Sequence, residues 1–322
     1  ATAQASGLSA TASASGELTI NWTGATFPSS GATQGGYALI YSTATPSLSS
    51  ANATAPAAGT GTLITITPTN LPTAPATSYV LSGLTAGTTY NFLLVPFTWD
   101  GTNTTTFHYL TSSAPTLSAT AVGNPSISTT TAISNITSSS ASSGGSGIVA
   151  NGGTISAKGV VWNTSSSPTT ANNSTTDGTG TAGFTSSLSG LSAQTFYYVR
   201  SYATNEVGTA YGNELNFRTL SNPATAQASG LSATASASGE LTINWTGATF
   251  PASGATQGGY ALVYTTGSPT LSSANGNATA AGVGTLITIT PTNLPTAPAT
   301  SYVLSGLTGG TTYNFLLVPF TW

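Results

Sequence analysis

Apolar and polar residues alternate along most of this chain. The alternation is clearest at Leu18–Trp22 and Tyr37–Tyr41 of the first repeat unit, and further predicted strands follow at Thr62–Thr67, Ser78–Leu81 and Tyr90–Trp99. A period of two is typical of β-strands with one buried face, and the clusters of Gly, Pro, Asn and Ser between the stretches predict turns. No stretch keeps the 3.6-residue period of an amphipathic helix. About seven short strands per ~100 residues predict an all-β chain built from β-sandwiches.

An internal repeat divides the chain into units. Residues 1–99 recur as residues 224–322 without insertion or deletion, with 11 differences in 99 positions. Seven of these differences lie between Ala44 and Thr60, whose composition predicts a loop, whereas the predicted strands are nearly unchanged. A different unit separates the two copies. We therefore predict an A–B–A array, with repeat A at residues 1–116, repeat B at residues 117–220 and a second copy of repeat A at residues 221–322.

The second copy of repeat A lacks the last strand of the first. In the first copy, Trp99 is followed by a turn at Asp100–Asn103 and a predicted last strand at Thr104–Leu110, whereas the second copy ends at Trp322. A sheet without its terminal strand has an open edge that something must cover. We expect the chain to be a window on a longer array in which A and B alternate. The alternative is that a neighbouring chain supplies the missing strand.

One motif occurs in every unit, directly before the longest strand. The motif is Leu-x-x-x-Thr-x-Tyr, and its tyrosines are Tyr90, Tyr197 and Tyr313. It resembles the tyrosine corner of fibronectin type III-like sandwiches, in which the buried hydroxyl bonds to nearby backbone. Trp22 and Trp245 stand where that family places a core tryptophan on its second strand. The resemblance implies tandem fibronectin type III/Ig-like β-sandwich domains with these five aromatic residues in structural roles.

The middle unit is similar to a narrower group of proteins. Its segments 158–164, 177–181, 197–205 and 208–214 resemble the repeats of large secreted surface proteins of Bacteroidota, although Val161 stands where many relatives have Cys. Those proteins are often adhesins or stalks exported across the outer membrane. The resemblance therefore implies an extracellular protein, secreted or attached to the cell surface.

Composition excludes several classes of function. The chain has 3 Lys or Arg and 6 Asp or Glu, a net charge of −3, no Cys and one His. Three cations cannot neutralise the phosphates of a nucleic acid. Without Cys, there is no disulfide framework, zinc–thiolate site or cysteine nucleophile. The longest apolar run, Phe92–Phe97, is far shorter than the ~18 residues that span a bilayer. Because so few charges separate neighbouring copies, self-association is favoured.

Few residues are candidates for chemistry. His108, on the predicted last strand of the first copy, is expected to be a surface or half-buried residue. Asp100 and Asp177 each offer one carboxylate to a Ca²⁺ ion, but each precedes a Gly, and a turn explains both more simply. No Gly-x-Ser-x-Gly motif with Asp and His partners is present. We predict no catalytic, cofactor-binding or metal-binding residues, no cofactor, and a protein that is not an enzyme.

The strand after the tyrosine corner has two apolar faces in A. A sandwich strand needs only one, and in B the residues Tyr198, Arg200 and Tyr202 are expected to face solvent. The second face in A needs a cover, which is an intramolecular loop, the next domain or another chain. We hypothesise that A units pack on one another through it. This candidate assembly face comprises Leu93, Val95, Phe97 and Trp99 in the first copy and Leu316, Val318, Phe320 and Trp322 in the second.

These features predict a structural protein. We interpret the chain as a non-catalytic extracellular repeat protein that forms a stalk, adhesin shaft or filament by end-to-end and lateral packing of its sandwiches. Short connectors that contain proline, such as 220–223, are expected to keep the rod stiff. Two alternatives remain: spacer domains of a secreted carbohydrate-active enzyme, and a glycan-binding adhesin module that stacks sugars on Trp99, Trp162, Tyr198 or Tyr202.

Overall fold

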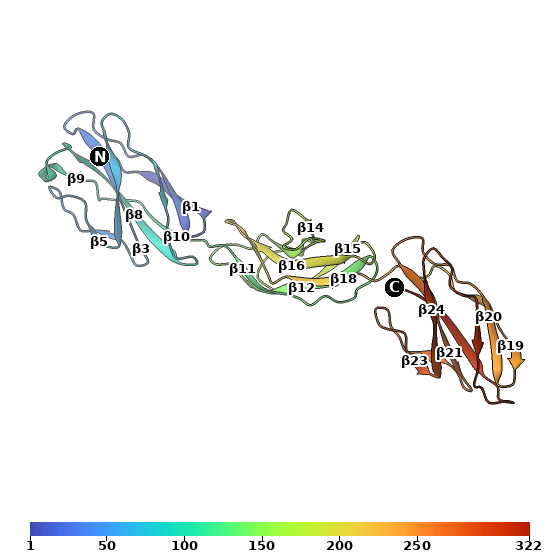
Figure 1. Ribbon diagram of the computed structural model, residues 1–322. Coiled ribbons are helices and arrows are strands. Elements are labelled where there is room, and N and C mark those ends of the chain that lie inside the picture. Colours follow the sequence, from blue (N-terminus) through green and yellow to red (C-terminus); the bar gives the residue numbers. More distant parts are fainter.

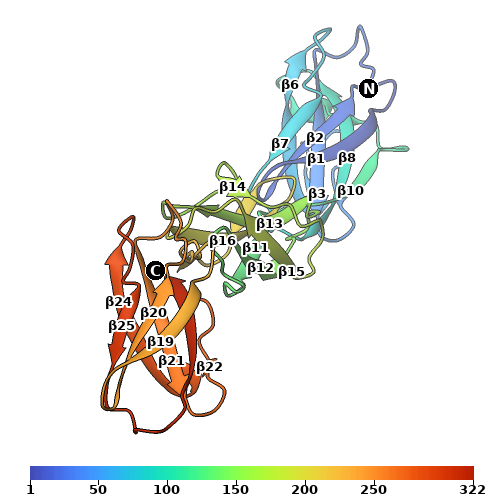
Figure 2. The same cartoon turned by 90° about the vertical axis from the view of Figure 1, so that its right-hand side faces the viewer.

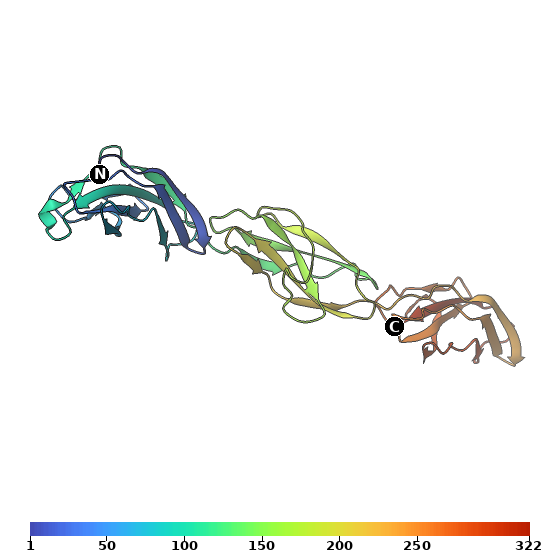
Figure 3. The ribbon, with the colours of Figure 1, turned by 90° about the horizontal axis from the view of Figure 1, so that it is seen from above.

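Three β-modules follow one another end to end in the computed structural model (Figures 1 and 3). It describes the backbone of residues 1–322 and every side chain except that of Thr290. Within that backbone, the only helical segment is the 3₁₀ turn η1 (Thr104–Thr106). The chain is therefore an all-β, tandem array of sandwiches.

The first module is a sandwich of two antiparallel sheets. One sheet has the order β1 (Ser6–Ala14), β2 (Glu17–Thr23) and β7 (Ser78–Leu81). The other has the order β10 (Thr116–Thr120), β8 (Thr89–Trp99), β3 (Gln34–Ser42) and β6 (Thr62–Asn70), and β9 (His108–Tyr109) pairs with the end of β8. A small hairpin joins β4 (Ser47–Leu48) to β5 (Ala58–Thr60).

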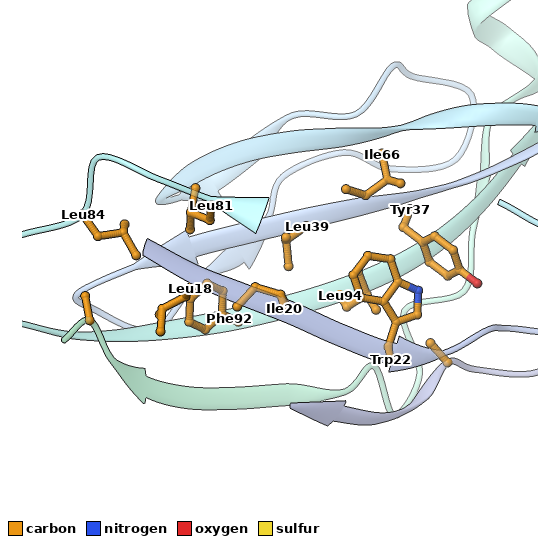
Figure 4. Close-up of a cluster of buried hydrophobic side chains, with 12 residues drawn as sticks. Leu18, Ile20, Trp22, Tyr37, Leu39, Ile66, Leu81, Leu84, Phe92 and Leu94 are labelled. Carbon is orange, nitrogen blue, oxygen red and sulfur yellow. The ribbon is translucent and has the colours of Figure 1, made fainter. Parts of the chain in front are cut away.

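The core of this module lies between the two sheets (Figure 4). Its buried side chains include Leu18, Ile20, Trp22, Tyr37, Leu39, Ile66, Leu81, Leu84, Phe92 and Leu94. Trp22 packs edge-on against Tyr37 with 5.4 Å between ring centroids, and the Tyr37 hydroxyl accepts a hydrogen bond from the Ala25 amide at 2.7 Å. Each large apolar side chain that is buried contributes about 1.5–3 kcal/mol, so this core supplies most of the folding energy of the module.

A tyrosine-corner hydrogen bond is present in every module. In each case the hydroxyl accepts from a backbone amide five residues earlier in the chain. The pairs are Tyr90 with Thr85 (3.1 Å), Tyr197 with Ser192 (3.0 Å) and Tyr313 with Thr308 (3.2 Å). The bond fixes the loop before the longest strand against that strand.

The middle module has the same plan with different strands. One sheet has the order β11 (Ser126–Thr130), β12 (Ser140–Val149) and β15 (Phe184–Ser189). The other has the order β14 (Asn173–Ser174), β13 (Ala157–Asn163), β16 (Phe196–Thr204) and β17 (Thr209–Tyr211), and β18 (Leu215–Arg218) also pairs with β16. Tyr202, predicted to face solvent, is buried instead, because its hydroxyl donates to the Thr175 carbonyl (2.8 Å) of a segment that covers this face.

The second copy of A repeats the strand pairing of the first. Its sheets are β19 (Ser229–Ala237), β20 (Glu240–Thr246) and β25 (Ser301–Leu304), and β24 (Thr285–Asn293), β21 (Gln257–Thr265) and β26 (Asn314–Thr321). The hairpin of β22 (Thr270–Leu271) and β23 (Ala281–Val283) matches β4 and β5. Among the described residues, no strand pairs with the edge of β26 that corresponds to the β9 and β10 side of β8. Figure 2 shows the three modules from a second direction.

The end of the first module differs from the sequence prediction. The predicted last strand at Thr104–Leu110 is instead η1 followed by the two-residue β9, because the Asn103 side chain accepts a hydrogen bond from the Thr105 amide (3.0 Å) and so favours a turn. The last strand is β10, which pairs with β8. The predicted domain boundary between residues 116 and 117 therefore falls inside a strand of the first module.

Candidate functional site

The candidate assembly face of the first copy is covered by its own chain. Val95 is 1% exposed and Phe97 is 0% exposed. The Phe107 ring lies 5.4 Å from that of Phe97 and is stacked 4.6 Å from that of Trp99, as distances between centroids. We call residues 107–109 the aromatic plug. The hypothesis that another A unit covers this face is wrong for the first copy, because the plug already occupies it.

The hairpin loop between β4 and β5 holds the aromatic plug in place. Asn52 accepts a hydrogen bond from the Tyr109 amide (2.9 Å), and the Tyr109 hydroxyl donates to the Thr54 carbonyl (2.8 Å). The Ala53 amide donates to the Phe107 carbonyl (2.8 Å). Burial raises the pKa of Tyr109 to about 12. Residues 44–60, which the sequence predicted to be a loop, thus hold the aromatic plug against the sheet through hydrogen bonds.

Two aromatic residues in the sequence point to the aromatic plug, although they belong to no alternating pattern. Phe107 and Tyr109 are the only Phe, Tyr or Trp residues between Trp99 and Trp162. Two isolated aromatic residues next to a strand with two apolar faces are a natural cover for one of those faces, since each ring buries a large apolar area.

Most of the aromatic residues considered for sugar stacking are buried or already packed against other side chains. The Trp99 ring stacks on Phe107, and its Nε1 donates to Gln34 Oε1 at 2.6 Å. Trp162 and Tyr202 are buried. Of the four aromatic residues considered, only Tyr198 is neither buried nor stacked on the aromatic plug. These side chains do not form a shared platform for a sugar.

The second copy of the candidate assembly face is open. Leu316, Val318 and Phe320 are partly exposed, and Trp322 is 56% exposed. Among the described residues, none packs on this side of β26 as residues 107–109 pack on β8. The same apolar side chains that are sealed in the first copy therefore meet solvent in the second.

The side chains of β26 that point towards the core of the module are also partly exposed. Phe92 and Leu94 are fully buried in the first copy, whereas the equivalent Phe315 and Leu317 are only partly buried. Every residue of β19 is exposed, including Leu231 at 41%. In the first copy, Leu117 and Ala119 of β10 pack against the core at the equivalent place.

The carboxylates lie in separate hydrogen-bonded turns. Asp100 Oδ1 accepts from the amides of Thr102 (2.9 Å) and Asn103 (2.7 Å), and these bonds lower its pKa. Asp177 Oδ2 accepts from the hydroxyls of Thr175 (2.6 Å) and Ser186. His108 is exposed on β9. The described residues include no group of three His, Cys, Asp or Glu side chains that could hold a metal ion.

All three cationic side chains donate to backbone carbonyls. Lys158, 5% exposed, donates to the Ala182 carbonyl at 2.6 Å, and Arg200 and Arg218 donate to those of Gly212 (3.2 Å) and Gln194 (3.1 Å). Arg200 also lies over the Tyr211 ring, 4.7 Å from its centroid. The cations therefore serve as structural braces within the middle module.

The joint between the first and middle modules is hydrogen-bonded on both sides. The Gly16 amide of the first module donates to the Val122 carbonyl (2.9 Å), and the Gly123 amide donates to the Asn151 carbonyl of the middle module (2.8 Å). Asn205 Nδ2 reaches back to the Gly123 carbonyl at 2.7 Å. A Cβ on Gly123 would lie 2.5 Å from the Ala86 Cβ, so the modules meet too closely for a larger residue there.

The second joint is fixed in a similar way. The Leu220 amide donates to the Thr137 carbonyl (3.0 Å) of the middle module, and the Asn222 amide donates to the Gly254 carbonyl (2.6 Å) of the second A module. Thr321 Oγ1 donates to the Asn222 carbonyl (2.7 Å), which ties the end of β26 to the joint. Each linker ends in Asn-Pro, and proline restricts the backbone at that point.

No protein-family model matches the chain, and no curated protein matches it. A solved structure that resembles it is the crystal structure of chicken CNTN1 FN1-FN3 domains, with a TM-score of 0.37 and 15% identity over 67% of this chain and 66% of that one. The chain thus spans about two thirds of the length of that structure. The fold class, tandem fibronectin type III/Ig-like sandwiches, follows from the strand order and tyrosine corners of this chain itself. No helix in the described structure is long and apolar enough to cross a membrane.

Proposed function

We propose that this chain is a structural, non-catalytic repeat protein whose modules form a stiff extracellular rod, such as a stalk, adhesin shaft or filament. The observation that carries the proposal is the pair of joints, in which linker residues are hydrogen-bonded to the modules on both sides. A rod of this kind acts by keeping its two ends a fixed distance apart. The low charge of the surface supports association of such rods, since few charges oppose close approach.

Small-angle X-ray scattering tests the rod. The longest strand has 11 residues, or ~36 Å at ~3.3 Å per residue, so three modules end to end measure roughly 110 Å. A rod of that length has a radius of gyration of roughly 30 Å, compared with about 20 Å for a compact domain of the same number of residues. A measured value near that of the compact domain would reject the proposal.

Two matched insertions test whether the joints keep the rod stiff. A Gly-Gly-Ser-Gly insertion between Val122 and Gly123 separates the residue that is bonded to Gly16 from the residue that is bonded to Asn151, and should lower the radius of gyration and broaden the distance distribution. The same insertion between Ser30 and Gly31, in an exposed loop at the free end of the first module, should change neither. An equal response to both insertions would show that the joints do not determine the shape.

The extracellular location is supported by the middle module, whose segments resemble repeats of secreted surface proteins. Protease treatment of intact source cells, followed by detection of peptides from residues 117–220, tests it. Release of these peptides before any cytoplasmic marker is the expected result. Protection until the cells are lysed would contradict it.

A further inference from the structure

We propose that β6 and β24 join neighbouring rods side by side, each by pairing antiparallel with β6 or β24 of a second copy of this chain. We call residues 62–67 of β6 and the identical residues 285–290 of β24 the A-unit edges. The proposal deepens the association of rods proposed above, and rests on that association only for the purpose of the contact.

Each A-unit edge has a strand on one side only. β6 is the outer strand of its sheet and pairs with β3, and β24 pairs with β21 in the same way. Figure 2 shows both strands at the sides of their modules. Among the described residues, no backbone hydrogen bond outside the sheets involves either A-unit edge. Because alternate residues of a strand point their N–H and C=O groups to the same side, about half of these groups are free to bond another strand.

The A-unit edges lack the features that usually protect an outer strand. Residues 18–99 contain no Asp, Glu, Lys or Arg, and neither do residues 241–322. The proline of β6, Pro68, stands just beyond residues 62–67, next to a register shift in the pairing with β3. An uncharged six-residue strand of Thr, Leu and Ile, without Pro or Gly, is the type of segment that pairs with other chains.

The middle module protects the equivalent edge of its own sheet. Its outer strand β14 has only two residues, compared with nine in β6. Beyond β14, the Asp177 amide donates to the Lys158 carbonyl at 2.7 Å, which places a residue with a carboxylate at this border of the sheet. Short outer strands and charged residues are features that prevent pairing between sheets. The difference assigns the contact to the A units.

The sequence of the A-unit edge complements itself. If two copies of residues 62–67 pair about a two-fold axis at Thr65, Ile64 of each copy lies opposite Ile66 of the other. Ile66 is buried in the core of its module and Ile64 packs beside it, so the isoleucine pairs join the two cores. On the other face, Thr65 meets its own counterpart. Pairs of β-branched residues directly opposite one another stabilise a sheet.

The charge and number of the A-unit edges favour a second copy as the partner. An uncharged edge meets an equally uncharged edge without removing any ion from water. A single contact over six residues is smaller than the ~800 Å² per partner of a typical stable complex, so one contact alone is weak. Each chain carries the edge twice, however, and linked contacts between the same two rods bind more tightly than a single one.

Sedimentation velocity of the 322-residue chain tests the proposal. Association should increase with concentration between about 10 µM and 1 mM, the range expected of weak contacts. Thr65→Lys with Thr288→Lys places like charges opposite each other at the two-fold axis, and should raise the dissociation constant about tenfold or more. The control, Thr19→Lys with Thr242→Lys, adds the same charge on the central strands β2 and β20 and should associate as the parent does. Equal losses in the two variants, or a parent that stays monomeric up to about 1 mM, would overturn the proposal.

Introduced cysteines test the register, since the chain has none of its own. Thr65→Cys with Thr288→Cys places thiols on paired residues, whose Cβ atoms lie about 5 Å apart and can form a disulfide after a small shift. Thr62→Cys with Thr285→Cys, at equally exposed positions, places them about 20 Å apart, because the strands run in opposite directions. In air, the first variant should form covalent dimers about tenfold faster or more. Equal rates would overturn the proposed pairing.

Hydrogen exchange identifies the strands that associate. Peptides that include Thr60 or Val283 distinguish the two copies, and their amides should exchange more slowly as the concentration rises. Slowing confined to other strands would overturn the assignment. Peptides from residues 100–123, which occur once, check that each variant stays folded. None of these results changes the scattering test of the rod in dilute solution, so failure here is distinguishable from failure of the proposed function.

Discussion

Replacement of Phe107 by Ala measures how firmly the aromatic plug seals the outer face of the first module. The ring is buried, is stacked on the Trp99 ring at 4.6 Å and lies tilted against the Phe97 ring at 5.4 Å, as distances between centroids. Loss of a buried Phe ring costs about 3–5 kcal/mol, and the lower end is expected here because the plug lies at the periphery, where neighbours can partly close the gap. With a urea dependence of roughly 2 kcal/mol per M, the midpoint of this module should fall by about 1.5 M.

The assay must report on one module, because the unfolding of three modules does not reduce to a single transition. Hydrogen exchange measured by mass spectrometry along a urea series meets this need, since peptides from residues 100–123 have no counterpart in the second copy. His108→Ala, at the exposed residue next to Phe107, is the control and should stay within about 0.5 kcal/mol of the parent. A loss in Phe107→Ala no larger than in this control would refute a sealed outer face.

Three other predictions address single hydrogen bonds, a titration and a joint. Tyr90→Phe should destabilise the first module by about 1 kcal/mol through loss of the bond to the Thr85 amide, with Tyr79→Phe as the control. Equal effects in the same urea series, followed by hydrogen exchange of residues 100–123, would contradict a tyrosine corner. The pKa of Tyr109 is raised to about 12 in the fold and is near 10 when unfolded, so its contribution is complete below pH ~10 and is lost as the pH rises towards about 12. Absorbance titration should therefore lose its last-titrating tyrosine in Tyr109→Phe, and an unchanged curve would rule out this assignment. Asn205→Ala should speed amide exchange at residues 121–124 by removing the bonds to Gly123 and Ala150, whereas the exposed Asn172→Ala should not.

Local pattern was sufficient to predict much of the fold. The signals that did so depend on residues close together in the chain. They are the alternation in β2 and β3 and the motif that ends in Tyr90. These signals predicted the sandwich class, the repeat and the tyrosine corners. The core position of Trp22 was implied by the resemblance to fibronectin type III-like sandwiches, and Trp22 is buried against Tyr37.

The features that the sequence did not predict depend on contacts between residues that are far apart in the chain. β10 has only five residues, mostly small, and its place beside β8 depends on closing a loop of more than fifteen residues. The two apolar faces of β8 showed that a cover was needed, but a strand pattern does not say which segment provides it. The cover came from Phe107 and Tyr109, held by hydrogen bonds to a loop some 50 residues earlier in the chain. The burial of Tyr202 is a similar case, because the covering segment around Thr175 follows no strand period.

The bracing of every Lys and Arg side chain by backbone carbonyls has a consequence for the setting in which such a rod works. Dissolved ions weaken attraction between opposite charges at a surface, whereas salts that are excluded from the protein surface strengthen apolar packing. The cohesion of the modules should therefore not weaken between dilute and concentrated brine. The proposed rod would therefore keep its stiffness where salinity fluctuates.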